Sequence, residues 1–197
     1  MKKGRMGRMN YVEPQDLLLE NPIIASVKNK SDLEACLNSS VSLVFLLFGN
    51  LLEIVSLVDQ IKARGKIVII PIDLVEGLSS HDAAVDYIKE CTKADGIVST
   101  KASLLRYAKS LGLLTVQRFF MLDSRALENI IRQIDSSYTD IIEVIPGGLP
   151  KVLKKVAGAS NKPIIAGGYI LDRDDIMDAL KAGATAVTTS NVALWNM

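Results

Sequence analysis

The sequence predicts a small (β/α)8 TIM-type barrel with short connections, and three observations support this fold. Apolar strand-like runs alternate with helix-like runs along the whole chain, giving eight strands and seven intervening helices. Several runs are apolar without alternation, as in parallel strands that are buried on both faces. Two strand ends, Gly167-Gly168 and Thr189-Ser190, flank one helix, in the manner of the phosphate sites that such barrels build after their last two strands. An open doubly wound sheet is the alternative fold.

The predicted strands are rich in Ile and Val, which is typical of buried parallel strands. They cover Pro22–Val27, Ser42–Phe48, Lys66–Asp73, Gly96–Thr100, Leu114–Leu122, Asp140–Ile145, Pro163–Gly167 and Ala186–Thr189. Residues 1–21 are expected to form an N-terminal extension, with a short helix at Pro14–Glu20 against the bottom of the barrel. Residues 22–197 are expected to form a single barrel domain.

Helix signals lie between these strands. Ser31-Asp32-Leu33-Glu34 has the form of a capping box, and Asp123 and Asp172 are suited to cap two later helices. Gly65 and Gly112 suit helix C-terminal ends. The alternation of strands and capped helices therefore continues to the end of the chain.

Bulk composition excludes several classes of protein. The chain has 197 residues, 49% of them hydrophobic and 23% charged, with a net charge of +1. No global field therefore favours nucleic acid, and an RNA partner would require a local patch. The longest apolar run, Val41–Phe48, is too short to span a membrane. Since no signal peptide is recognisable, we expect a cytoplasmic protein. Cys36 and Cys91 have no metal or redox spacing and are expected to be buried free thiols.

A phosphate cup is the main functional prediction. Gly167 and Gly168 allow the backbone to approach an anion, and Thr189 and Ser190 add hydroxyl donors. The alternative is turn chemistry with helix capping. Gly147 is expected either to form a third wall of the cup or to belong to a tight turn.

Charged residues near the other strand ends are candidates for binding the rest of a phosphorylated ligand, because function in this fold gathers at the C-terminal strand ends. Arg118 and its neighbour Gln117 point to opposite faces of one strand, and Arg118 is predicted to face the interior. The alternative is a polar network across the barrel mouth. The candidates are Lys28, Asp73, Lys101, Arg118 and Glu143.

No catalytic residue, cofactor or metal site is predicted. His81, the single histidine, stands beside Ser79, Ser80 and Asp82, where a helix cap or a solvent-facing position is expected. Two basic groups are candidates for RNA contact, although such groups are more often solvated surfaces or flexible chain ends than binding sites. One is the N-terminal group Lys2, Lys3, Arg5 and Arg8, and the other is Lys151, Lys154 and Lys155.

Several segments resemble, in order, the motifs of the glycerol uptake operon antiterminator family. The resemblance covers about residues 21–196. It is carried by Ile23-Ile24-Ala25 with Lys28, Asp73–Leu78, Asp95–Thr100, Gly112–Phe120 with Asp123-Ser124, Glu143–Gly147, Pro163–Gly168 and Thr189-Ser190 with Leu194-Trp195.

The resemblance implies a regulator, not an enzyme. It implies a response to glycerol 3-phosphate, binding to the leader mRNA of a glycerol-metabolism operon, transcription past a terminator and stabilisation of the message. A phosphosugar enzyme of the aldolase or isomerase type, with Asp73 or Glu143 as base and Lys101 as electrophile, is the alternative, since fold alone does not exclude it. A homo-oligomer is left open.

The chain departs from the family pattern at two positions. Pro71 stands where the family usually has a histidine, and Tyr169 replaces a leucine after the Gly-Gly pair. If the histidine position contacts the ligand, this member is expected to have an altered affinity or a different effector.

Overall fold

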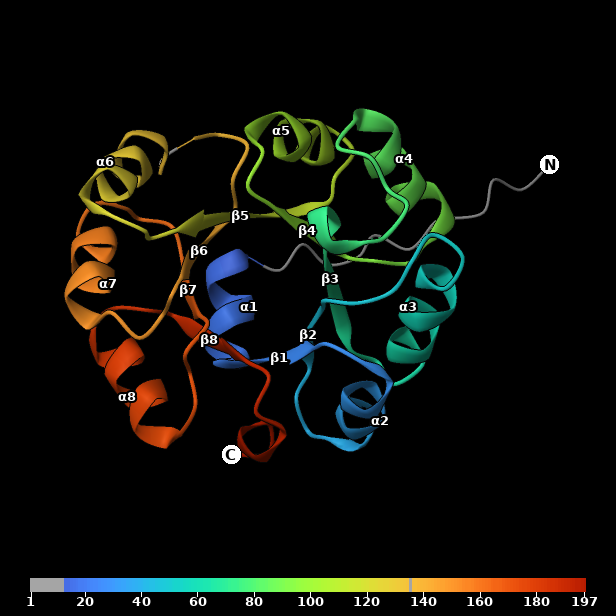
Figure 1. Ribbon diagram of the computed structural model, residues 1–197, viewed down its shortest axis with the longest axis horizontal. Coiled ribbons are helices and arrows are strands. Elements are labelled where there is room, and N and C mark those ends of the chain that lie inside the picture. Colours follow the sequence, from blue (N-terminus) through green and yellow to red (C-terminus); the bar gives the residue numbers. More distant parts are fainter. Residues whose placement is uncertain (1–12, 135) are drawn as a thin grey trace.

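A computed structural model describes residues 13–134 and 136–197. Its eight strands are all parallel and form one closed barrel in the order β1 to β8, with β8 pairing with β1 (Figure 1). The predicted (β/α)8 fold is therefore confirmed, and the open sheet is wrong. The basic residues of the N-terminal stretch, Lys2, Lys3, Arg5 and Arg8, lie outside the described residues.

The elements follow the predicted order. The strands are β1 (Ile23–Val27), β2 (Leu43–Leu46), β3 (Ile67–Pro71), β4 (Gly96–Ser99), β5 (Leu114–Phe120), β6 (Ile141–Ile145), β7 (Ile164–Gly167) and β8 (Ala186–Thr189). The helices are α1 (Pro14–Glu20), α2 (Lys30–Asn38), α3 (Ile54–Lys62), α4 (Asp82–Cys91), α5 (Ala102–Ser110), α6 (Ser124–Gln133), α7 (Pro150–Ala157) and α8 (Arg173–Lys181). Two short 3-10 helices, η1 (Ile72–Leu74) and η2 (Val192–Leu194), follow β3 and β8.

Some strands end earlier than the apolar pattern suggested. The run expected to reach Asp73 stops at Pro71, because the chain turns into η1. The run expected to reach Leu122 stops at Phe120, and Leu122 is 88% exposed. Apolar residues beyond the ladder therefore belong to the loops at the C-terminal end of the barrel.

Side-chain alternation along the strands separates two apolar layers. One set points into the barrel and packs around Phe45, Ile69 and Val116, and the other packs beneath the surrounding helices. Leu18 of α1 is fully buried in the interior cluster, and Figure 1 shows α1 across the barrel opening. The boundary between an N-terminal extension and the barrel domain stays a prediction.

Helix capping agrees with the sequence signals at two of three sites. Asp123 caps α6, and Asp172 caps α8 in a capping box with Asp175. For α2 the expected box at Ser31 is wrong: the cap is Asn29, whose side chain accepts from the backbone N–H of Asp32. The helix therefore begins two residues earlier than the Ser31 signal suggested.

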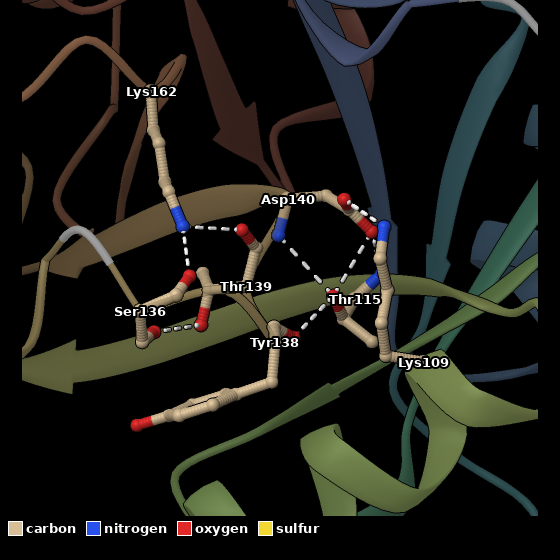
Figure 2. A network of polar contacts seen from close by, with 7 residues as sticks. All are labelled: Lys109, Thr115, Ser136, Tyr138, Thr139, Asp140 and Lys162. Atoms are coloured by element: carbon tan, nitrogen blue, oxygen red, sulfur yellow. Dashed lines mark hydrogen bonds and ion pairs between the residues drawn. The ribbon is translucent and has the colours of Figure 1, made fainter.

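A hydrogen-bonded network fixes the N-terminal end of the barrel (Figure 2). Lys109 at the end of α5 binds the Asp140 carboxylate, which also accepts from the backbone N–H of Thr115 at 3.0 Å. Lys162 donates to the backbone carbonyls of Ser136 and, at 2.6 Å, of Thr139. Each cation thus ties one barrel segment to the next.

The same arrangement recurs two strands earlier in the barrel, between β3 and β4. Lys62 at the end of α3 binds Asp95 at 2.7 Å, and Asp95 accepts from the backbone N–H of Val68 at 2.8 Å. Lys66 donates to the carbonyls of Ser39 and Val41, and burial lowers the pKa of Lys66. These pairs stabilise the barrel at the end opposite the predicted site.

Both cysteines are free thiols, but only Cys36 is buried as expected; Cys91 is exposed because it lies at the end of α4.

No helix within the described ranges is long and apolar enough to cross a membrane.

Candidate functional site

A pocket of about 230 Å³ opens at the C-terminal end of the barrel. It is lined mainly by the ends of β1 and β5–β8 and by the loop after β7. The lining residues are Ser26, Lys28, Leu47, Leu74, Arg118, Glu143, Ile145, Gly168, Tyr169, Ile170, Leu171, Thr188, Thr189 and Ser190. The pocket therefore occupies the edge at which (β/α)8 barrels place their functional residues.

The loop after β7 has an unusual backbone. Gly168 has φ +73° and Tyr169 has φ +57°, so two successive residues are left-handed, one of them with a side chain. Such strain in a non-glycine residue is costly and gathers at functional sites. The N–H groups of Gly168, Tyr169 and Ser190 donate no hydrogen bond to any described residue. Successive backbone N–H groups in such a turn conformation are donors of the kind that bind anions.

Thr189 and Ser190 differ in what their hydroxyls do. The Thr189 hydroxyl donates to the Ile170 carbonyl at 2.7 Å and accepts from the Asn191 N–H at 3.1 Å, so it orders the loop. Among the described residues, Ser190 forms no side-chain hydrogen bond and lines the pocket. The indole of Trp195 donates to the Thr189 carbonyl at 2.9 Å, which fixes the end of β8.

Gly147 and Gly167 lie behind the pocket lining. The Gly147 N–H donates to the carbonyls of Gly167 at 2.6 Å and of Gly168 at 3.0 Å, which joins the β6 loop to the β7 loop. A Cβ on Gly167 would lie 2.6 Å from Thr188 Oγ1 and 2.9 Å from Glu143 Oε1. Gly167 therefore makes room for polar side chains, and Gly147 supports the loop that carries Gly168.

A buried ion pair forms the floor of the pocket. Arg118 of β5 and Glu143 of β6 are register partners, and Arg118 Nε lies 2.6 Å from Glu143 Oε2, with side chains 12% and 1% exposed. The Thr188 hydroxyl lies 3.5 Å from Glu143 Oε1. Burial raises the pKa of Glu143, while the charge of Arg118 and the hydrogen bonds from Arg118 and Thr188 oppose the shift.

The pocket lining carries a net positive charge. Arg118 offsets Glu143, and the exposed Lys28 forms no ion pair with a described residue, so the lining holds one cation in excess. Gln117, the neighbour of Arg118, points outward, and its Oε1 accepts a hydrogen bond from the Thr139 hydroxyl at 2.8 Å. The expected inward orientation of Arg118 agrees with this geometry.

Two predicted ligand contacts lie outside the pocket lining. Asp73 in η1 accepts from the Ser99 hydroxyl at 2.8 Å and from the Thr100 N–H at 3.2 Å. Lys101 is exposed and precedes α5 as its N-cap. The predicted enzyme arrangement of Asp73 with Lys101 is therefore not assembled at this pocket. His81 also lies elsewhere, as the exposed N-cap residue of α4.

Three polar residues of the lining, Ser26, Tyr169 and Thr188, were not predicted as ligand contacts. Ser26 and Thr188 point inward two residues from the interior side chains of Ile24 and Ala186, so strand alternation was the available signal. Tyr169 is 73% exposed beside the cup. Within the described residues no group of three His, Cys, Asp or Glu side chains could hold a metal ion.

Lys151, Lys154 and Lys155 lie on α7, away from the pocket lining. All three are exposed, and α7 contains no acidic residue. Because α7 follows directly on the β6 loop, it is connected to the pocket through Gly147.

The fold and the pocket define a (β/α)8-barrel protein with a small, positively charged pocket at its C-terminal end. The chain belongs to the glycerol-3-phosphate responsive antiterminator family, whose profile matches residues 23–195. An uncharacterized Escherichia coli protein, YgcP, is 39% identical over 181 residues, which are 92% of this chain and 95% of that protein.

Two solved structures with related sequences have the same fold. The glycerol uptake operon antiterminator regulatory protein of Listeria monocytogenes has a TM-score of 0.84 and 35% identity, covering 88% of this chain and 94% of that one. A glycerol uptake operon antiterminator-related protein of Thermotoga maritima has a TM-score of 0.80 and 33% identity, covering 90% and 99%. The resemblance inferred from the sequence motifs is confirmed.

More distant structures show the fold alone. The orotidine 5'-phosphate decarboxylase of Pyrococcus horikoshii is 17% identical with a TM-score of 0.65, covering 85% of this chain and 88% of that chain. Enzymes occur among such neighbours, but identity this low carries no activity to this chain.

Proposed function

We propose that the protein is a non-enzymatic regulator that binds glycerol 3-phosphate in the barrel pocket. In this proposal it also binds the leader mRNA of a glycerol-metabolism operon, lets transcription continue past a terminator and stabilises the message. The observation that carries the proposal is a pocket with an excess cation and free backbone N–H groups in a member of this family.

The phosphate group would lie against Gly168 and Ser190. Their N–H groups donate no hydrogen bond to a described residue, and the Ser190 hydroxyl adds a further donor. Lys28 supplies the excess positive charge, which suits a phosphate monoester carrying between one and two negative charges at neutral pH. The α8 N-terminus is closed by the Asp172–Asp175 capping box, so the anion would occupy the loop and not that helix end.

The glycerol part would lie over the ion pair. The Glu143 carboxylate can accept hydrogen bonds from alcohol hydroxyls, and Ser26 and Thr188 lie in the same lining. Leu47, Leu74 and Ile145 provide apolar contacts for the carbon chain. A small polyol phosphate therefore matches both the polarity and the size of the pocket.

Regulation requires that effector and RNA affinities depend on each other. Such coupling is reciprocal and commonly amounts to about 1–3 kcal/mol. The Gly147 hydrogen bonds connect the loop after β7, called the cup loop here (residues 168–171), to the segment that leads into α7. These bonds give the coupling a physical route. Cytoplasmic localisation is part of this proposal, because the RNA target is there.

The test is RNA binding by the full chain, measured with the leader transcript in the presence and absence of glycerol 3-phosphate. The expected result is an RNA affinity that changes about 5- to 100-fold with the ligand, while the ligand is recovered unchanged. Absence of RNA binding at moderate salt in both conditions would contradict the proposal, and so would consumption of the ligand.

A further inference from the structure

Charge is divided unevenly among the helices that surround the barrel. The adjacent helices α5, α6 and α7 carry seven Lys and Arg residues and one Glu, a formal charge of +6. The other five helices carry five basic and eleven acidic residues, a formal charge of −6. The net charge of the whole chain therefore hides a basic face, which we define as the exposed surface of α5–α7 (Figure 1).

Two nearby cations belong to the scaffold and not to this face. Lys109 of α5 is held by Asp140, and Lys162 donates to the carbonyls of Ser136 and Thr139 (Figure 2). The basic face is left with six exposed cationic side chains: Arg106, Arg125, Arg132, Lys151, Lys154 and Lys155. None of these six forms an ion pair with a described residue.

The arrangement of these cations suits an extended polyanion. Lys151, Lys154 and Lys155 are spaced i, i+3 and i+4 and so share one side of α7. α6 and α7 pack against each other and α5 precedes them around the barrel, so the cations extend over three successive helices (Figure 1). A small phosphate ligand would need only one part of such a surface, whereas a nucleic acid backbone presents charges along its length.

The edge of the face also offers an aromatic contact. Arg106 lies over the ring of Tyr138, with its guanidinium carbon 5.0 Å from the ring centroid. Figure 2 shows the Tyr138 ring directed away from the polar network, whose bonds use only its backbone carbonyl. Arginine and aromatic planes are the groups on which unpaired RNA bases stack.

The scarcity of exposed apolar side chains on the basic face favours RNA over a lipid surface as its partner. Among the exposed large apolar side chains of the described residues, only Ile131 belongs to α5–α7. Several of the others, including Leu74, Leu122 and Leu171, lie in loops at the C-terminal strand ends. A membrane-binding face would need apolar side chains among its cations.

We infer that the basic face of α5–α7 binds the phosphate backbone of RNA, an inference that rests on the function proposed above. Its α7 part begins at Pro150, five residues after Ile145 of the pocket lining, and Gly147 between them is bonded to Gly167 and Gly168. The surface that contacts RNA is thus joined to the cup loop by one short segment.

The experiment compares two triple variants of the full chain. The test variant is Lys151→Gln/Lys154→Gln/Lys155→Gln. The control, Lys30→Gln/Lys89→Gln/Lys93→Gln, removes the same charge from exposed lysines on and near α2 and α4. RNA affinity is measured by filter binding across a salt series, and glycerol 3-phosphate binding is measured by calorimetry to verify that the pocket is intact.

The test variant is expected to lose at least about tenfold in RNA affinity. Its slope of log affinity against log salt should fall by about 2, since each lost contact to a single strand removes about 0.7. The control should bind RNA like the wild type, and both variants should bind glycerol 3-phosphate normally.

The outcomes separate this inference from the proposed function. RNA binding by the wild type with no difference between the test variant and the wild type overturns the inference alone. Equal losses in both triple variants also overturn it, because the effect is then one of total charge. Failure of the wild type to bind any RNA overturns the proposed function, and the inference falls with it.

Discussion

The two ends of the barrel differ in whether their charged and polar groups have bonding partners. At the N-terminal end, Lys62 and Lys109 bind Asp95 and Asp140, and each of these carboxylates also accepts a backbone N–H. At the C-terminal end, Arg118 and Glu143 pair on the pocket floor, while the Lys28 ammonium group and the N–H groups of Gly168, Tyr169 and Ser190 have no partner among the described residues. Paired charges stabilise the fold at one end, and unpaired donors lie at the end where we propose that the ligand binds.

The largest expected effect comes from breaking the pocket ion pair. Arg118→Met leaves the buried Glu143 without its cation and should lower the free energy of unfolding by about 3–5 kcal/mol. The measurement is urea denaturation. The double variant Arg118→Met/Glu143→Leu should recover most of the loss, because it removes the stranded charge. Equal instability of the single and double variants would contradict this explanation.

Removing the excess cation should affect binding and not stability. Lys28→Gln is expected to weaken glycerol 3-phosphate binding about 10- to 100-fold, the range of one charge-assisted hydrogen bond. Calorimetry gives the affinity and thermal denaturation gives the stability. An unchanged affinity would remove Lys28 from the site.

The opposite end should respond in the opposite way. Lys109→Met strands the Asp140 carboxylate, whose side chain is 10% exposed, and should cost about 1–3 kcal/mol of unfolding free energy. Ligand affinity should match the wild type. A large loss of affinity in this variant would mean that the two ends are not independent.

Glu143 should give stability a small pH dependence. Because burial raises the pKa of Glu143, the folded state retains this proton to a higher pH than the unfolded state does. Its contribution to stability therefore falls as pH rises from the ordinary pKa to the raised one, by at most about 1.4 kcal/mol per pH unit. This contribution is isolated by comparing the unfolding free energies of the wild type and Glu143→Gln. The comparison covers about pH 4–8, because the ordinary carboxyl pKa lies at the lower end of that range. A contribution that rises with pH would contradict the direction of the shift.

Strand number and order could be predicted from the sequence because parallel barrel strands are marked by short apolar runs. Strand alternation required that only one of Gln117 and Arg118 face the interior but did not decide between them, and the structure has Arg118 inside and Gln117 outside. Thr188 was missed because the site was predicted from residue types at the strand end alone. Strand alternation would have shown that Thr188 points toward Glu143, whereas Thr189 points to the other side.

Other features depended on distant partners. Asp73 and Lys101 follow strand ends, yet η1 directs Asp73 to Ser99 and Lys101 caps α5, and the apolar pattern does not record such turns. Lys62 and Asp95 are 33 residues apart and meet only once the barrel closes. Pro71 is buried at the end of β3 and outside the pocket lining, so the predicted change of effector stays a prediction.

The most direct test of the account is calorimetric titration of glycerol 3-phosphate into the wild type, Gly168→Val and Gly112→Val. Both glycines have φ near +73°, but Gly168 lies in the cup loop and Gly112 follows α5 at the other end of the barrel, with open space around a new side chain. The account predicts saturable binding to the wild type and to Gly112→Val, and loss of binding in Gly168→Val. No binding to the wild type, or equal affinity in all three proteins, would contradict it.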